Sequence, residues 1–151
     1  MKEIKNLTRS IGFEKFDPLS PDEVNKLLDF EKFCMGNLLP SGFKYFISLH
    51  NGGSFDECLF LNSPIGPVVV AFFLPVFNDS IESIESSFAY FKEEVTDRAI
   101  PFASDPGGNY FLLGFKVENM NKVYFWDHEK NALHVICSSF EEFVNSLVVD
   151  D

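Results

Sequence analysis

The sequence lacks the features of a disulfide scaffold, a zinc site or a membrane span. Its three cysteines, Cys34, Cys58 and Cys137, are widely spaced and form no CxxC pair. This odd, scattered set predicts buried thiols rather than a disulfide or zinc framework. The longest apolar run, residues 68–77, contains Pro75 and is far shorter than the roughly 20 residues of a membrane helix. The N-terminal segment has no continuous apolar stretch typical of a signal peptide, so we expect a cytoplasmic protein.

Positive charge is also scarce. The chain has 12 Lys and Arg residues against 23 Asp and Glu residues, a formal net charge of −11. Such a surface repels nucleic acids and anionic membranes, which are bound through Lys and Arg. No Lys or Arg occurs from Tyr45 to Phe91, where the acidic residues are Asp56, Glu57, Asp79, Glu82 and Glu85. We predict that these five residues bind a positively charged protein partner; the alternative is that they only keep the protein soluble.

What the chain has in abundance is phenylalanine, 19 residues among 151, which predicts an aromatic core in one domain. Helix signals occur at four places. Ser20-Pro21-Asp22-Glu23 reads as a capping box, and a second helix over residues 40–50 is ended by Asn51-Gly52-Gly53. A third helix is predicted from near Ser80 through Val95, with Glu82, Glu85 and Glu93 toward water. A fourth follows a capping box at Ser139, and its apolar face is Phe143, Val144, Leu147 and Val148.

Strands are predicted over residues 55–61, 67–74, 110–115, 122–126 and 133–137. The connections in the second half are too short for parallel crossovers. We therefore expect an α+β fold, with a central, mostly antiparallel sheet of about five to six strands flanked by about four helices in a single domain. Residues 1–19 are predicted as an arm or short helix, residues 20–148 as the domain, and residues 149–151 as an acidic tail.

The segment from Asp105 to Asn109 contains two adjacent glycines, so we compared it with phosphate and metal loops. No Lys follows the glycines and the next residues favour a strand, which argues against a phosphate loop. Asp105 is a single carboxylate, whereas a calcium loop needs several at alternate positions. A tight turn explains the segment, with Asp105 bonding its own backbone and Gly107 and Gly108 supplying positive φ.

Trp126-Asp127-His128 raises the possibility of a general base, because a histidine stands beside a carboxylate. On a strand, however, Asp127 and His128 point to opposite faces. The chain has no GxSxG or HExxH motif, and its three histidines share no ligand spacing. We predict no catalytic residue, no metal ion and no cofactor. A small hydrolase using Asp105, Asp127 and His128 is the alternative.

Four groups of residues in order resemble the SUKH superfamily, which includes the fungal cell-wall-synthesis regulator and many bacterial immunity proteins. The groups are Leu39-Pro40 with Tyr45-Phe46 and Asn51-Gly52-Gly53; Ile100 to Ala103 with Asp105 and Gly107 to Tyr110; Val123 to His128; and Ser139 to Phe143. The resemblance implies a non-enzymatic α+β protein that binds and neutralises a toxin, such as a nuclease, in the cytosol. It also implies a structural role for Gly107, Gly108, Asn109, Trp126, Asp127 and His128. An intracellular regulator or scaffold with a non-toxin partner is the alternative, and the interface and oligomeric state stay open.

Overall fold

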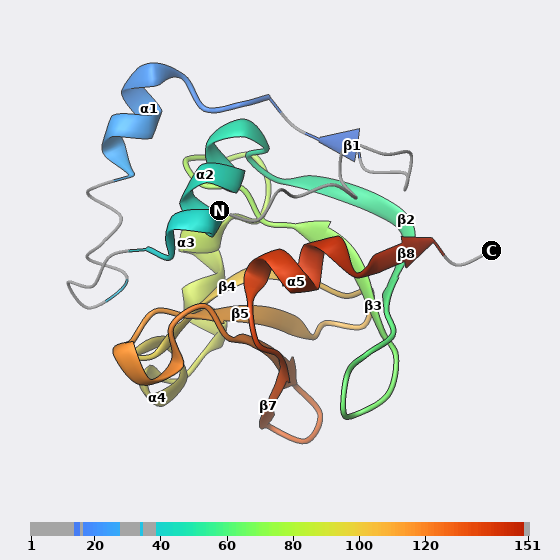
Figure 1. Cartoon of the computed structure of the whole chain (residues 1–151). Helices are drawn as coiled ribbons and strands as arrows, with labels where there is room; N and C mark the ends of the chain where they lie inside the picture. Colours follow the sequence, from blue (N-terminus) through green and yellow to red (C-terminus); the bar gives the residue numbers. More distant parts are fainter. Residues whose placement is uncertain (1–13, 16, 28–33, 35–38, 150–151) are drawn as a thin grey trace.

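The structure, a computed structural model, describes residues 14–15, 17–27, 34 and 39–149 as an α+β fold (Figure 1). In chain order the elements are β1 (Glu14–Lys15), α1 (Pro21–Lys26), α2 (Ser41–Leu49), β2 (Gly53–Phe60), β3 (Val68–Phe73), α3 (Ile84–Ser87), the 3-10 helix η3 (Phe88–Tyr90), α4 (Glu93–Thr96), β4 (Ala99–Ser104), β5 (Tyr110–Gly114), the 3-10 helix η4 (Val117–Asn119), β6 (Val123–Asp127), β7 (Ala132–Cys137), α5 (Phe140–Asn145) and β8 (Leu147–Val149).

One curled antiparallel sheet organises the domain. Its strand order is β1-β2-β3-β4-β5-β6-β7, and β8 pairs with β2. Antiparallel pairing was predicted, but five to six strands was too few, since the described residues form eight. The missed β4 contains Pro101, which has no amide hydrogen for a sheet. The strand tolerates it because its register with β5 shifts between Pro101 and Ala103.

The inner face of the sheet carries the aromatic core. The helices α2 and α5 lie over this face and contact each other (Figure 1). Phe43 of α2 meets Phe140 of α5 edge to face, with ring centroids 5.3 Å apart. Phe143 of α5 packs on Phe102 of β4 and Phe111 of β5, at 5.7 and 5.4 Å. The first two contacts are edge to face and the third is tilted, and edge-to-face contacts stabilise a core beyond the burial of the rings alone. The predicted aromatic core is confirmed.

The first and last helices begin at the predicted residues, but only the first has the complete predicted capping box; at Ser139 the N-cap bond forms alone, and the Glu142 side chain accepts from Ser138 Oγ instead. Glu23 N donates to Ser20 Oγ (3.2 Å) and Ser20 N donates to Glu23 Oε1 (3.0 Å), which completes a capping box before α1. At α5, Glu142 N donates to Ser139 Oγ (3.1 Å). The fourth helix was predicted to include Leu147 and Val148, and this is wrong. Residues 147–149 form β8 instead, because the edge of β2 offers an unpaired strand to the chain leaving α5.

The third helix is not continuous, contrary to the prediction. The segment forms α3, η3 and α4, and Phe91 between η3 and α4 is extended, with φ −117° and ψ 148°. The apolar spacing that predicted a single helix serves two cores. Ile84 and Phe88 pack in the main core, whereas Phe91 and Val95 pack in a second cluster with Ala99 and Leu112. One straight helix cannot reach both clusters, so the segment bends.

Candidate partner-binding surface

The five predicted acidic residues differ in their surroundings. Asp56 and Glu57 belong to β2, where the pairing with β3 shifts between Ser54 and Cys58, and their side chains lie outside the described part. Asp79 is exposed in the loop between β3 and α3. Glu82 and Glu85 were predicted to face water, but each is half-buried and bonded to the protein. The acidic stretch is therefore partly built into the fold.

Glu85 fixes a strained loop. Its Oε2 accepts a hydrogen bond from Phe77 N (2.8 Å), and Phe77 has φ +54°, which is unusual for a bulky side chain. Glu85 Oε1 is buried and has no hydrogen-bond partner among the described residues. Burial raises the pKa of Glu85 above its usual range, and the neighbouring charge of Asp79 adds to this effect. Such strain and burial are typical of loops kept in shape for recognition.

Asn51 anchors the same loop from the other side. Its Nδ2 donates to Val76 O (2.9 Å), and Val76 N donates to Asn51 Oδ1 (2.8 Å). The sequence analysis predicted Asn51-Gly52-Gly53 as the end of the second helix and as part of the SUKH-like pattern, without this bond to Val76. As predicted, α2 ends at Leu49, and Gly52 has φ +90°. A groove of about 620 Å³ lies between this loop and the start of α1. Its lining includes Asp17, Glu23, Asn51, Phe77, Asn78 and Ile81.

The segment from Asp105 to Asn109 is a turn, as predicted. Asp105 Oδ1 accepts from Gly107 N (2.9 Å) and Asn109 N (2.8 Å), while Asp105 Oδ2 accepts from Asn109 Nδ2 (2.8 Å). Gly108 has φ +90°, as expected, but Gly107 does not have a positive φ. Since Gly108 alone supplies the left-handed conformation, the prediction for Gly107 is wrong. The Asp105 carboxylate therefore bonds to residues of its own turn and stabilises it.

Asn109 joins this turn to the end of β6. Its Oδ1 accepts from His128 N (3.0 Å) and lies 2.7 Å from His128 Nδ1. Asp127 Oδ1 instead accepts from Glu129 N (3.1 Å) and Lys130 N (3.2 Å) in the following turn. Asp127 and His128 thus bond to different turns, and Asp105 reaches His128 only through Asn109. Each group makes bonds that hold backbone in place, an arrangement typical of structural turns.

Among the described residues, no three or more His, Cys, Asp or Glu side chains lie close enough together to hold a metal ion. All three cysteines are buried, as predicted. Burial raises the pKa of Cys58 to about 11, so its thiol is protonated and poorly nucleophilic at neutral pH.

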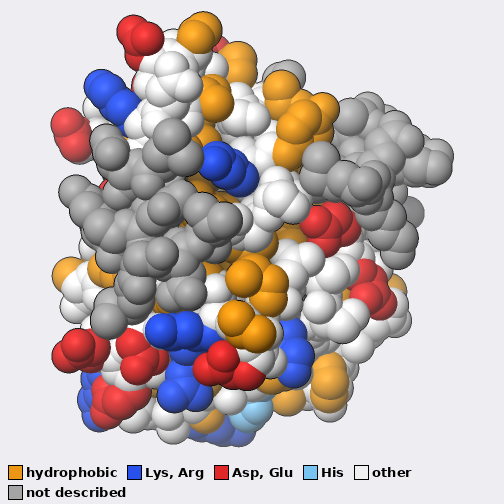
Figure 2. Space-filling view, turned by 60° about the vertical axis from the view of Figure 1, so that its left-hand side comes forward, with side chains coloured by type: hydrophobic (Ala, Val, Ile, Leu, Met, Phe, Trp, Pro, Cys, Tyr) orange, Lys and Arg blue, Asp and Glu red, His pale blue; other side chains and the backbone are white. Residues whose placement is uncertain are grey.

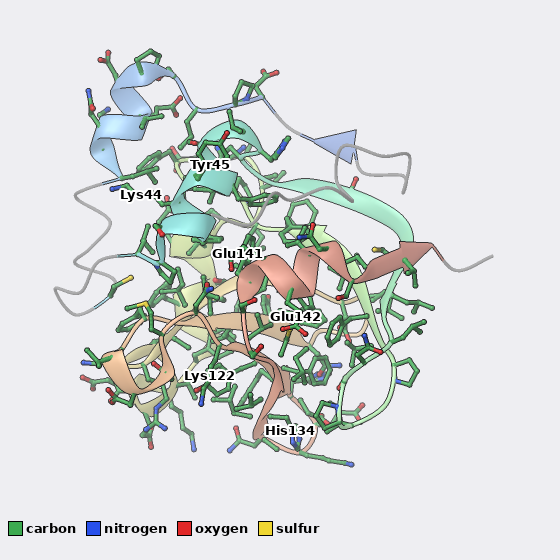
Figure 3. The ribbon with its side chains drawn as sticks, viewed as in Figure 1. Lys44, Tyr45, Lys122, His134, Glu141 and Glu142 are labelled. Carbon is green, nitrogen blue, oxygen red and sulfur yellow. The ribbon has the colours of Figure 1, made fainter. Side chains whose placement is uncertain are left out.

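His134 lies on β7 and Glu141 and Glu142 on α5 (Figure 3). These carboxylates bond to nearby groups, Asn121 Nδ2 (2.8 Å) and Ser138 Oγ (2.7 Å) respectively.

The outer face of the sheet carries an aromatic surface that the sequence analysis missed. Tyr110 of β5 lies opposite Trp126 of β6, which lies opposite Leu133 of β7. Leu112, Tyr124 and Val135 form the next row on the same face. Val95 of α4 covers Leu112, but Tyr110, Tyr124, Trp126 and Leu133 are only half-buried, and Val135 is 48% exposed. Strand pairing, rather than any motif, brings these residues together.

A second cleft, of about 360 Å³, lies beside Tyr124 and is lined by several Lys and Arg side chains. Its lining includes Asp97, Arg98, Lys116, Glu118, Lys122 and Tyr124. Figure 2 shows Lys and Arg side chains mixed with acidic ones at the lower end of the molecule. Arg98 Nε lies 3.6 Å from Asp97 Oδ1, and both side chains are about half exposed. Opposite charges at this cleft largely offset one another.

Comparison with known proteins places these features in a family. The model of the SMI1 / KNR4 family (SUKH-1) matches residues 18–146. The chain is also 26% identical over 169 residues to the SPbeta prophage-derived uncharacterized protein YokK of Bacillus subtilis (strain 168), covering 97% of this chain and 83% of that protein. The family match confirms the resemblance to the SUKH superfamily. Among the described residues, no helix has both the length and the apolar character needed to span a membrane.

Proposed function

The chain belongs to the SMI1 / KNR4 family (SUKH-1), and we propose that it is a non-enzymatic, cytoplasmic immunity-type protein that neutralises a cognate basic toxin. The partner is a cationic, nuclease-like toxin domain, and the protein covers the positive groups that this domain uses to bind nucleic acid. No cofactor or metal ion takes part. Membership of this family and similarity to a prophage-derived protein support the proposal.

The observation that carries the proposal is negative charge without internal compensation. Within the residues that the structure describes, the ion pair between Arg98 and Asp97 is the one recorded. Asp79, Glu82 and Glu85 have no Lys or Arg partner there, and none occurs between Tyr45 and Phe91 in the sequence. Carboxylates left without cations attract a basic partner over a distance, which raises the rate of encounter.

Asp79 and Glu82 are the acidic residues that we propose meet the partner directly. Asp79 is exposed, and Glu82 is half-exposed with one oxygen bonded to Tyr110. Glu85 contributes by holding Phe77 in the loop that carries Asp79. Asp56 and Glu57 remain predicted contacts, on the backbone position of β2 alone.

The proposal predicts that a basic toxin domain is encoded beside this chain's gene, and it is tested with the product of that neighbouring reading frame. Co-expression is expected to restore growth of cells that make the toxin domain, and the two purified proteins are expected to form a stoichiometric complex. Their association rate should fall at least tenfold as salt rises from about 0.05 to 0.5 M, because screening shortens long-range attraction. Equal rates at the two salt concentrations would remove the electrostatic part of the proposal.

Matched charge reversals separate this surface from the rest of the molecule. Asp79→Lys should slow association, because it places a cation in a region that otherwise has none. Glu118→Lys is the control: Glu118 is also exposed but lines the cleft that already contains Arg98 and Lys116. Equal slowing by both substitutions would contradict a localised surface. Recovery from the source cell of a stoichiometric partner that is not a toxin would favour a regulator or scaffold instead.

A further inference from the structure

Resting on the proposed function, we propose that Tyr90, Tyr110 and Glu82 form a binding site for an arginine side chain of the protein partner. The site lies on the outer face of the sheet, where Phe91 and Trp126 extend it. We refer to these five residues as the aromatic patch. Glu82 lies in the loop before α3, Tyr90 ends η3, Phe91 follows it, and Tyr110 and Trp126 come from two neighbouring strands.

The rings of the patch are fixed against one another. Tyr90 stacks on Tyr110 with ring centroids 6.0 Å apart and an interplanar angle of 29°. Phe91 meets Tyr110 edge to face at 5.3 Å and Trp126 at 5.9 Å. Tyr110 and Trp126 are direct cross-strand neighbours. The patch therefore offers preformed ring faces and loses little conformational entropy on binding.

Tyr90 is the most exposed aromatic residue of the patch, and packing within the fold does not account for this exposure. Its side chain is 66% exposed, more than the other aromatic residues with large exposed surface, Tyr45 at 55% and Phe77 at 37%. One ring face is covered by Tyr110, so the remaining surface is available to a ligand. Tyrosine and tryptophan are enriched among the residues that dominate protein interfaces. Tyr90, exposed and stacked on the ring of Tyr110, is therefore suited to be a main contact residue of an interface.

Glu82 gives the patch its preference for a cation. Its Oε1 accepts a hydrogen bond from the Tyr110 hydroxyl, so the carboxylate lies at the edge of the stacked rings. Burial, together with this bond, raises the pKa of Tyr110 further above neutral pH, where a tyrosine hydroxyl is already a donor. Among the described residues no Lys or Arg pairs with Glu82. The carboxylate charge thus remains available beside an aromatic face.

A guanidinium group matches this combination better than an ammonium group. It is planar, stacks on aromatic rings and donates two parallel hydrogen bonds to a carboxylate. An ammonium is more strongly hydrated; it can pair with the carboxylate and lie over a ring, but it offers neither planar stacking nor two parallel hydrogen bonds. A basic toxin domain carries arginines where it binds phosphate groups, so neutralisation through such a residue would block nucleic acid directly.

The inference is tested first with a simple probe. N-acetylated, amidated hexa-arginine is titrated into the full chain, and binding is followed by the fluorescence of Trp126, the one tryptophan of the chain, and by two-dimensional NMR. Quenching and shifts at the patch are expected, with weaker binding of hexa-lysine. Tyr90→Ala should weaken hexa-arginine binding about fivefold, and Glu82→Gln should weaken it similarly because the charge is lost while an acceptor for Tyr110 remains.

Matched controls separate the site from general charge and from misfolding. Tyr45→Ala removes another exposed tyrosine, on α2 (Figure 3), and Glu118→Gln removes another exposed carboxylate. Both should bind hexa-arginine like the wild type. Tyr90→Phe keeps the ring and should also bind normally. Equal binding by Tyr90→Ala and the wild type would overturn the inference, as would NMR shifts confined to the groove between Phe77 and the start of α1.

The toxin assay distinguishes the two proposals. If Tyr90→Ala and Glu82→Gln neutralise the neighbouring toxin as well as the wild type does, the site is wrong and the immunity function stands. If hexa-arginine binds the patch and no neighbouring toxin is neutralised, the immunity function is wrong and the site stands. Loss of neutralisation in these two variants, with the controls unaffected, supports both.

Discussion

Replacing Asn109 by alanine removes the side chain that joins two turns. The substitution deletes the bond from Asn109 Nδ2 to Asp105 Oδ2 (2.8 Å) and leaves His128 N and Nδ1 without the oxygen that lies 3.0 and 2.7 Å away. The bond to an ionised carboxylate contributes about 1.5–3 kcal/mol, and the bond from the exposed His128 contributes less, since water replaces it. We therefore expect a loss of about 2 kcal/mol in the free energy of unfolding.

Urea unfolding at neutral pH, followed by Trp126 fluorescence, measures this loss. With a slope of about 2 kcal/mol per molar urea, the midpoint should fall by about 1 M. Asn62→Ala is the control, because Asn62 is exposed and such surface changes usually stay within about 0.5 kcal/mol. His128→Ala should cost less than Asn109→Ala, because the bond from His128 N survives. An unchanged midpoint for Asn109→Ala, or a larger loss for His128→Ala, would refute the structural role of Asn109.

Two further substitutions test the interior. Glu85→Gln removes a half-buried carboxylate whose pKa is raised by burial. Folding therefore favours its protonated form. The free energy of unfolding of the wild type, relative to that of Glu85→Gln, should rise as pH falls from 7 and become constant below about 4.3. Thermal unfolding at a series of pH values measures this difference. Gly114→Ala would place Cβ 2.2 Å from Asn119 O and should lower the free energy of unfolding by about 1–3 kcal/mol. In the control Gly107→Ala the new Cβ has no atom closer than 3.6 Å, so urea unfolding should show no change in this free energy.

Features encoded within a few residues were predictable from the sequence. The capping box at Ser20 and the carboxylate turn at Asp105 each depend on bonds between residues two to four positions apart. Such local bonds leave a composition signal, so their prediction needs no knowledge of distant contacts. The antiparallel order of β5, β6 and β7 followed in the same way from the short connections between them.

Features that depend on distant partners were missed. The strand β8 exists because β2 offers it an edge, and its residues carry the same apolar spacing as one turn of helix. The segment from Ile84 to Val95 bends because its apolar residues reach cores on two sides of the sheet. In both places the apolar pattern predicts which residues are buried but not which strand or core they pack against. That neighbouring element determines the backbone conformation.

The aromatic patch could not be predicted from strand periodicity. Residues 110–113 are Tyr, Phe, Leu and Leu, so both faces of β5 read as apolar and no alternation marks the exposed one. Tyr90 and Glu82 join the patch only through tertiary contacts with Tyr110. A pattern of this kind identifies strands but does not show which of their faces another element covers.

The position of Glu82 links the charge of the sequence to the surface of the fold. A carboxylate that only kept the protein soluble would gain nothing from a hydrogen bond to a half-buried tyrosine, since water would satisfy it equally. Glu82 is held by Tyr110, and Tyr110 in turn supports Tyr90 and Phe91. In the proposed site, long-range attraction and short-range contact would therefore act at one place, because the carboxylate proposed to attract a basic partner lies beside the rings proposed to hold it.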